Sequence, residues 1–227
     1  TATAALVRGG GDGLVSAPIV VLDGGTSYHE FSLCDPMLGP WFDQRLYVDD
    51  VSAETIAHAG TVVVPCRLNP DWLVAQADLL VEVLRQGRTL IAMGETEPHK
   101  WLPDIRFTPV PTNFWWWLDS DGDLGLSVAA PDHGLFDFLT LAEATWHYHG
   151  RFGVPKGAVS LIDDAEGGSI LLDDSTSWPG RLILTSLDPF YHHGSFFMPA
   201  ATRFLVGFTQ WVQSGMPAHR RQPATGS

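Results

Sequence analysis

The stretch 61–95 constrains the fold more than any other part of the chain. The β-branched run at 61–64 is typical of a strand buried on both faces, and a second apolar run follows at 89–93. Between them, Asn69 is a helix N-cap followed by proline, and apolar residues recur at three- and four-residue spacing over 72–85. A strand, a helix and a strand of this size predict a right-handed βαβ unit with parallel strands.

The rest of the chain extends this unit in two ways. The first half predicts parallel strands flanked by helices, starting near Pro18, Leu46, Thr61 and Thr89. Three later strands, separated by glycine-containing hairpin turns, are expected at 159–162, 169–172 and 181–186. The segment 144–148 alternates like a strand, and 199–212 is expected to be a helix with one apolar face.

Composition excludes several classes of function. With 45% hydrophobic and 17% charged residues, the 227-residue chain is typical of a globular protein with a buried core. Its net charge of −13 argues against nucleic-acid binding, which needs clustered Lys and Arg. No apolar run approaches the ~20 residues of a membrane span. Two cysteines are too few for a disulfide framework and favour a reduced, cytoplasmic setting.

The composition of the two terminal segments predicts the domain boundaries. Residues 1–17, rich in Ala, Gly and Thr, are expected to form a flexible N-terminal arm. Residues 18–213 are expected to form a single α/β domain, and 214–227 a flexible C-terminal tail.

Two segments resemble trehalose-utilisation (ThuA-like) proteins. The segment 23–29 (Asp-Gly-Gly-Thr-Ser-Tyr-His) is similar to that family's glycine-rich turn followed by histidine. The segment 180–188 begins with Gly-Arg and leads to two histidines and a closing helix, as the family's last strand does. The resemblance implies the class I glutamine amidotransferase-like superfamily. Its fold is a flavodoxin-like three-layer α/β sandwich, here with a mainly parallel central sheet and an antiparallel extension, and ThuA-like proteins are associated with carbohydrate metabolism.

The resemblance also identifies a departure. The superfamily's glutaminases place a cysteine on the turn after the strand that ends here at Met93, where this chain has Gly94 and Glu95. A thioester mechanism needs a thiolate at that turn. No later stretch matches the superfamily's His-x-Glu pair, so glutaminase activity is not expected.

Polar residues follow several of the predicted strands. The carboxyl ends of parallel strands meet at one edge of a sheet, which is where ligands bind. We therefore expect His29, Arg67, Glu95 and one of His192 and His193 to line a single pocket.

Each of these residues is a candidate for a specific role. His29, Glu95, His192 and His193 are the candidate catalytic residues, as proton donors or acceptors. Arg67 and Asp188 are candidate substrate-binding residues: Arg67 would anchor an anionic or hydroxyl-rich ligand, and Asp188 would also orient an imidazole. The alternatives are a loop histidine bonded to backbone at His29 and a helix cap at Glu95.

Two further groups have a functional and a structural interpretation. The aromatic run 114–117, with Trp116 as candidate substrate contact, suits stacking on a sugar ring, but also core packing or a homo-oligomer interface. His147 and His149 would share a strand face and form a metal pair, or else belong to a solvated face. Cys66 is more typical of a small buried residue than of a nucleophile. No other cofactor is expected.

Three functions remain open at this point. The first is an enzyme or enzyme-like protein that acts on a small molecule, a sugar or another polar metabolite. The second is a non-catalytic ligand-binding or oligomerisation module of the same fold. The third is a metal-dependent hydrolase that uses His147, His149 and a further histidine.

Overall fold

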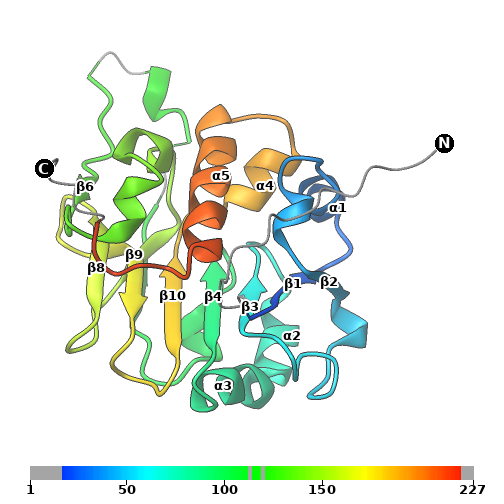
Figure 1. The fold of residues 1–227 in the computed structure, drawn as a ribbon. Helices are drawn as coiled ribbons and strands as arrows, with labels where there is room; N and C mark the ends of the chain where they lie inside the picture. Colours follow the sequence, from blue (N-terminus) through cyan, green and yellow to red (C-terminus); the bar gives the residue numbers. More distant parts are fainter. Residues whose placement is uncertain (1–16, 112–113, 119–120, 221–227) are drawn as a thin grey trace, which may run out of the picture.

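The centre of the molecule is a set of five parallel strands (Figure 1). The computed structural model describes residues 17–111, 114–118 and 121–220. The strands, in spatial order, are β2 (Gln44–Tyr47), β1 (Ile19–Asp23), β3 (Thr61–Val64), β4 (Thr89–Met93) and β10 (Arg181–Thr185). All neighbouring pairs among them are parallel, so the strands expected near Pro18, Leu46, Thr61 and Thr89 are confirmed.

Beyond β10 the sheet becomes antiparallel. β9 (Ser169–Asp174) pairs antiparallel with β10 and leads to β7 (Gly150–Phe152) and β5 (Phe107–Pro109). β8 (Val159–Asp163) also pairs with β9 and carries the short β6 (Ser127–Val128). The predicted antiparallel extension is therefore confirmed, and β8 and β9 lie where the hairpin turns put them, whereas β5, β6 and β7 were not predicted.

Helices cover both faces of the parallel strands. α1 (Ser27–Leu33), α4 (Pro189–Gly194) and α5 (Pro199–Gln213) lie on one side; α2 (Pro70–Ala75) and α3 (Ala77–Arg85) lie on the other (Figure 1). Alternate residues of a strand point to opposite faces, so Val21 packs in the α5 layer and Val20 in the α3 layer. The result is a three-layer sandwich.

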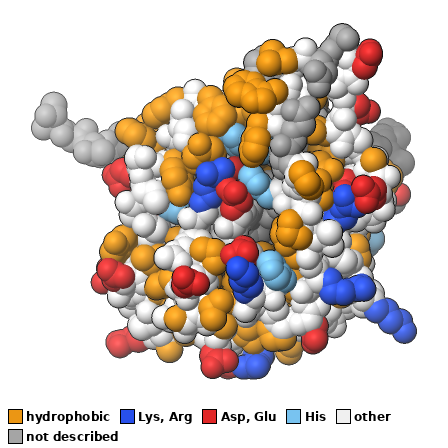
Figure 2. Space-filling view, turned by 180° about the vertical axis from the view of Figure 1, so that it is seen from behind, with side chains coloured by type: hydrophobic (Ala, Val, Ile, Leu, Met, Phe, Trp, Pro, Cys, Tyr) orange, Lys and Arg blue, Asp and Glu red, His pale blue; other side chains and the backbone are white. Residues whose placement is uncertain are grey.

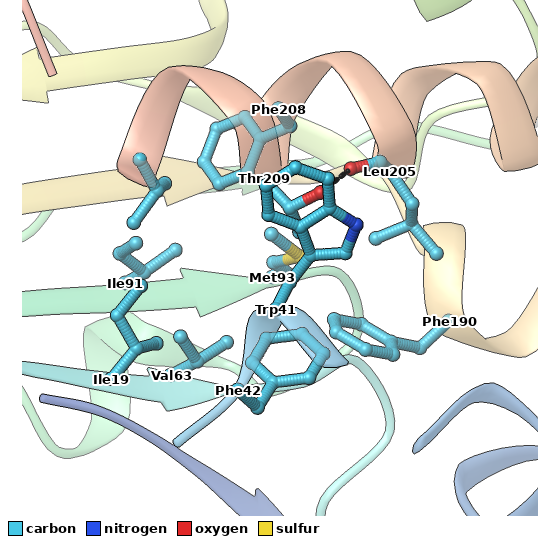
Figure 3. A pocket seen from close by; sticks show the side chains of 11 residues that line it. Ile19, Trp41, Phe42, Val63, Ile91, Met93, Phe190, Leu205, Phe208 and Thr209 are labelled. Atoms are coloured by element: carbon cyan, nitrogen blue, oxygen red, sulfur yellow. Dashed lines mark hydrogen bonds between the residues drawn. The ribbon is translucent and has the colours of Figure 1, made fainter. Parts of the chain in front are cut away.

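The layer under α5 is tightly packed. Leu205 and Phe208 of α5 lie over Ile91 and Met93 of β4 (Figure 3). The cavity among these apolar side chains measures only ≈ 10 Å³. This region is therefore core rather than a binding site, since a single water already needs about that much space.

Two local predictions need correction. The helix expected over 72–85 is two helices, because the backbone of Gln76 leaves helical geometry (φ −100°, ψ 8°) between α2 and α3. The segment 144–148 is no strand; a 3-10 turn ends at Ala144 and the next strand begins only at Gly150. Its alternation reflects side chains that are buried from a loop, Trp146 among them.

Part of the expected C-terminal tail is attached to the domain. The carbonyl of Met216 accepts a hydrogen bond from Arg181, and that of Pro217 accepts one from Trp211. Arg220 forms an ion pair with Asp137. The expected N-terminal arm, apart from residue 17, and residues 221–227 lie outside the described residues. No helix within the described ranges is long and apolar enough to cross a membrane.

Candidate functional site

A buried aspartate forms the middle of a polar cluster at the carboxyl edge of the sheet. Asp188 follows β10 and precedes Pro189, which starts α4; its carboxylate makes no capping bond and is fully buried. Its Oδ2 atom lies 3.1 Å from Nη2 of Arg67 and 3.2 Å from Nε2 of His149. These partners come from the end of β3 and from the loop before β7, so three segments meet here.

The other carboxylate oxygen faces two more histidines. Oδ1 of Asp188 lies 3.1 Å from Nε2 of His192 and 3.6 Å from Nε2 of His147, and it accepts a hydrogen bond from the Trp146 indole. The two Nε2 atoms are themselves 2.9 Å apart. We call His147, His149, His192 and Asp188 the histidine–aspartate centre.

Burial and hydrogen bonding act in opposite directions at this centre. Burial raises the pKa of Asp188, but hydrogen bonds from the three histidines outweigh it and hold that pKa well below its ordinary value. Burial lowers the pKa of His147 by more than Asp188 raises it. The carboxylate is therefore ionised at neutral pH, and the His147 imidazole is neutral.

Arg67 and Glu95 lie next to the centre. Nε of Arg67 is 2.7 Å from the Glu95 carboxylate, and the guanidinium stacks on the Tyr191 ring at 3.6 Å from its centroid. Glu95 also approaches His149, at 3.5 Å from Nδ1. Both carboxylates near Arg67 are thus paired with it, so its charge is already compensated.

A glycine permits this approach of β4 to α4. Gly94 has φ +34°, and a Cβ atom there would lie 2.7 Å from the Leu187 carbonyl oxygen and 2.8 Å from Cβ of Asp188. Any side chain would push the Glu95 turn away from Asp188. The turn after β4 is thus a close contact between two backbones.

Pockets open on two sides of the centre. One of ≈ 360 Å³ is lined by Glu95, His149, Ser186 and Phe107, among others. Another of ≈ 490 Å³ is mostly apolar and has the rings of His147 and His192 in its wall. Figure 2 shows histidine, acidic and basic side chains gathered among hydrophobic ones around a hollow in the middle of one face.

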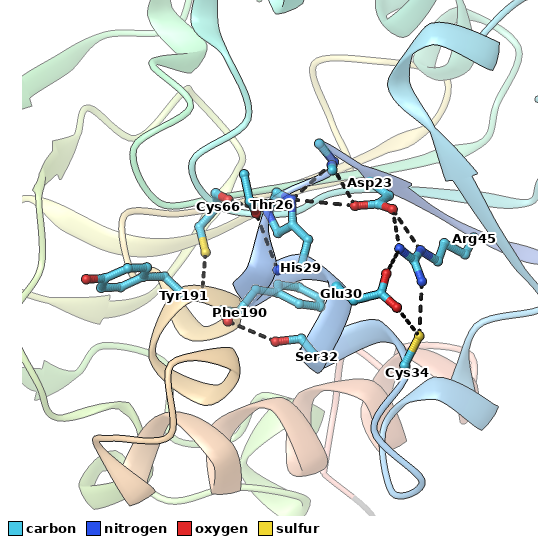
Figure 4. Close-up of polar contacts among 12 residues, drawn as sticks. Asp23, Thr26, His29, Glu30, Ser32, Cys34, Arg45, Cys66, Phe190 and Tyr191 are labelled. Atoms are coloured by element: carbon cyan, nitrogen blue, oxygen red, sulfur yellow. Dashed lines mark hydrogen bonds and ion pairs between the residues drawn. The ribbon is translucent and has the colours of Figure 1, made fainter.

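His29 does not join this cluster. It lies in α1 with no exposed surface; Nδ1 accepts a hydrogen bond from the Gly24 N–H, and Nε2 donates one to the Cys66 carbonyl (Figure 4). The pKa of His29 is lowered, because the effect of burial outweighs the opposite effects of the Cys66 carbonyl and of Asp23. Both ring nitrogens are therefore occupied by backbone groups, which was the structural alternative for this residue.

The two adjacent histidines of α4 have different surroundings. His192 belongs to the centre, whereas Nδ1 of His193 is 2.9 Å from the Thr202 hydroxyl and Nε2 is 3.6 Å from Asp35. Both lie in helix α4, where adjacent side chains point in different directions, so only one of the two faces Asp188.

Trp116 and Cys66 do not line either of the two pockets described above. Phe114 and Trp115 line the larger pocket, but the half-buried Trp116 is not among its lining residues. Cys66 is fully buried, its sulfur accepts the Tyr191 N–H, and burial raises its pKa well above the ordinary value.

Some residues of the site were not anticipated. Trp146 and Tyr191 were not expected to contact it, and His147 and His149 were considered apart from Asp188. One available signal concerned the choice between His192 and His193. Asp188 and His192 are four residues apart, which places both on one face of a helix. The alternation over 144–148 indicated a strand, so it did not identify the loop that delivers His147 and His149.

Comparisons with known proteins bear on the fold. A protein described as part of a GMP synthase from Thermoplasma acidophilum superposes with a TM-score of 0.51 at 13% identity, covering 86% of this chain and 95% of that one. A protein described as ThuA-like from Bacteroides uniformis gives 0.52 at 11% identity, covering 90% and 95%. No family model and no curated protein matches the sequence. The chain therefore has the class I glutamine amidotransferase-like, ThuA-like fold; at these identities the likeness concerns the fold alone.

Proposed function

We propose that this protein is an enzyme that binds a small, hydroxyl-rich metabolite, such as a sugar, at the carboxyl edge of its sheet. One observation carries the proposal: ionisable groups from the ends of β3, β4 and β10 and from the loop before β7 converge on one buried carboxylate beside open pockets. Buried charges cost free energy unless they are paired, so packing alone gives little reason to gather them.

The pocket beside Glu95 is the ligand site in this proposal. Its wall combines the partly exposed Glu95 carboxylate and the Ser186 hydroxyl, whose oxygen is buried and has no protein partner, with the ring of Phe107. Carboxylates and hydroxyls bind sugar hydroxyl groups, and an aromatic face packs on the apolar side of the ring. Its ≈ 360 Å³ suits a monosaccharide-sized ligand.

The roles follow from position. Glu95 contacts the ligand directly and exchanges a proton with one of its hydroxyl groups. Arg67 is a positioning residue, because its ion pair with Glu95 and its stacking on Tyr191 fix the carboxylate. His149 supports the same carboxylate from the other side.

Calorimetric titration with glucose, gluconate and trehalose tests the proposal. We expect at least one of them to bind the wild-type chain and Glu95→Gln to weaken that binding at least about tenfold, because the charged acceptor is lost. Glu82→Gln is the matched control, since it removes the same charge from the solvent-facing side of helix α3, and should bind normally.

Two results would contradict the proposal. One is that none of the three compounds binds the wild-type chain. The other is that Glu95→Gln binds as tightly as wild type. Product formation from the bound compound then separates an enzyme from a non-catalytic binding module, the alternative of the same fold.

A further inference from the structure

We infer that His147, His192 and Asp188 bind one divalent transition-metal ion, with Zn²⁺ as the best fit, and that His149 lies beside it as a fourth donor. The inference goes beyond the proposed ligand site and stands without it, because it rests on the inner, buried side of the centre.

The distances among the donor atoms match a tetrahedral site. Metal–nitrogen and metal–oxygen bonds of about 2.0–2.1 Å place neighbouring ligand atoms about 3.3 Å apart. Nε2 of His147 and Nε2 of His192 are 2.9 Å apart, and they lie 3.6 Å and 3.1 Å from Oδ1 of Asp188. The three atoms thus form a triangle whose edges bracket the tetrahedral value.

His149 lies close to two of these three ligands. Its ligand atom and those of His147 and Asp188 all lie within 4.8 Å of one another. Nε2 of His149 is buried and has no well-aligned hydrogen bond, although it faces Oδ2 of Asp188 at 3.2 Å. Imidazole nitrogen with one carboxylate oxygen is a donor set that Zn²⁺ and neighbouring first-row metals accept.

The charges at the centre also favour a cation. Arg67 contributes one positive charge, and Glu95 and Asp188 contribute two negative ones, so one negative charge remains when the imidazoles are neutral. Asp188 is fully buried and shares the single charge of Arg67 with Glu95, so its charge is only partly compensated, which is costly at a buried position. A metal ion compensates it and at the same time bonds three atoms that otherwise crowd one another.

An ion can reach this position and is supported there. His147 and His192 form part of the wall of the ≈ 490 Å³ pocket, so an ion that enters this pocket meets their rings. The Trp146 indole N–H donates to Oδ1 of Asp188 and so orients the carboxylate from outside.

Metal binding by the purified chain tests the inference. After dialysis against a chelator, Zn²⁺ alone is titrated by calorimetry, and Co²⁺ is added separately to record its visible absorption. We expect one Zn²⁺ per chain and the strong absorption of tetrahedral Co²⁺. In His192→Ala the affinity should fall at least about a hundredfold, as expected for loss of a ligand.

His193→Ala is the matched control, since this neighbouring histidine points to Thr202 and should leave affinity within about threefold of wild type. Circular dichroism checks that each variant folds, and His147→Gln is the second ligand variant. No Zn²⁺ binding by the wild-type chain overturns the inference outright, as does unchanged affinity in folded His192→Ala and His147→Gln. Sugar binding is measured separately, so its failure leaves this result intact.

Discussion

His29 links two backbone segments at the carboxyl edge of the sheet. Its imidazole joins the Gly24 N–H after β1 to the Cys66 carbonyl after β3, and it is completely buried (Figure 4). A group held this way orders the two turns from which Arg67 and the α1 helix emerge. We therefore assign it to stability, not to contact with a ligand.

Replacing this side chain should be costly. His29→Ala leaves a cavity, and it leaves the buried Cys66 carbonyl and the partly buried Gly24 N–H without these partners, so we expect a loss of about 2–4 kcal/mol in the free energy of unfolding. Urea denaturation measures it. His58→Ala, at a position outside this hydrogen-bond network, is the control and should change stability by less than about 0.5 kcal/mol.

The dependence of stability on pH gives a second readout for His29. Because its pKa in the folded chain is lowered from 6.5, the unfolded chain binds a proton below that pH which the folded chain does not. The stabilisation is complete above 6.5 and is lost as pH falls. Between about pH 7.5 and about pH 5.5, His29→Ala should lose stability less steeply than wild type. Equal slopes would show that His29 does not titrate in this way.

At the scale of elements, the meeting of β4 and α4 creates the site. The turn after β4 carries Glu95 and touches the backbone at Leu187 and Asp188, immediately before α4. This contact holds Glu95 and Asp188 on the same guanidinium. Positions of functional side chains here depend on a backbone distance that only glycine allows.

Gly94→Ala should therefore disturb both stability and the site. The added Cβ meets backbone atoms under 3.0 Å away. We therefore expect the free energy of unfolding to fall by about 2–4 kcal/mol, because of overpacking and the positive φ together. Thermal unfolding and Zn²⁺ titration are the measurements, and both the melting temperature and the affinity should fall.

Gly167→Ala is the control that measures the effect of a positive φ on stability without any steric overlap. Gly167 also has a positive φ (+77°), but nothing lies within 4 Å of an added Cβ. Gly167→Ala should lower the free energy of unfolding by about 1–2 kcal/mol, which is the penalty for the positive φ alone, and it should leave Zn²⁺ binding unchanged. If Gly94→Ala behaved no worse than Gly167→Ala, the close contact after β4 would have no functional part.

At the scale of the whole molecule, the parallel strands and the antiparallel extension each supply part of the site. β1, β3, β4 and β10 bring their carboxyl ends to one edge, where Arg67, Glu95 and Asp188 meet. The extension returns the chain to that edge and supplies His147 and His149 from the loop before β7. The site therefore needs both parts of the sheet.

The same architecture argues against glutaminase chemistry. The turn after β4 has no thiol, and Cys66, after β3, is buried with its pKa raised well above the ordinary value. A thiolate is needed to attack the amide. We expect no ammonia release from glutamine above background in a coupled assay. Release by the wild-type chain that Cys66→Ala abolishes would contradict this.

Local physical chemistry determined the order of elements. Two strands that are buried on both faces can be recognised from the sequence, because every consecutive residue in such a strand is apolar or β-branched. They lie at 61–64 and 89–93. The hairpin turns around β9 and the apolar face of α5 are local signals of the same kind. Together with the short resemblance, they sufficed for the fold.

The composition of the site was decided by the tertiary structure. Arg67 and Asp188 are 121 positions apart in the chain, and only their place at strand ends suggested that they meet. That rule predicted that Arg67, Glu95 and one of His192 and His193 lie together, without deciding between the two histidines, and it could not exclude His29, since burial beneath a turn depends on distant neighbours. His147 and His149 reach Asp188 from an irregular loop, whose path is set by packing against the rest of the molecule and not by its own residues.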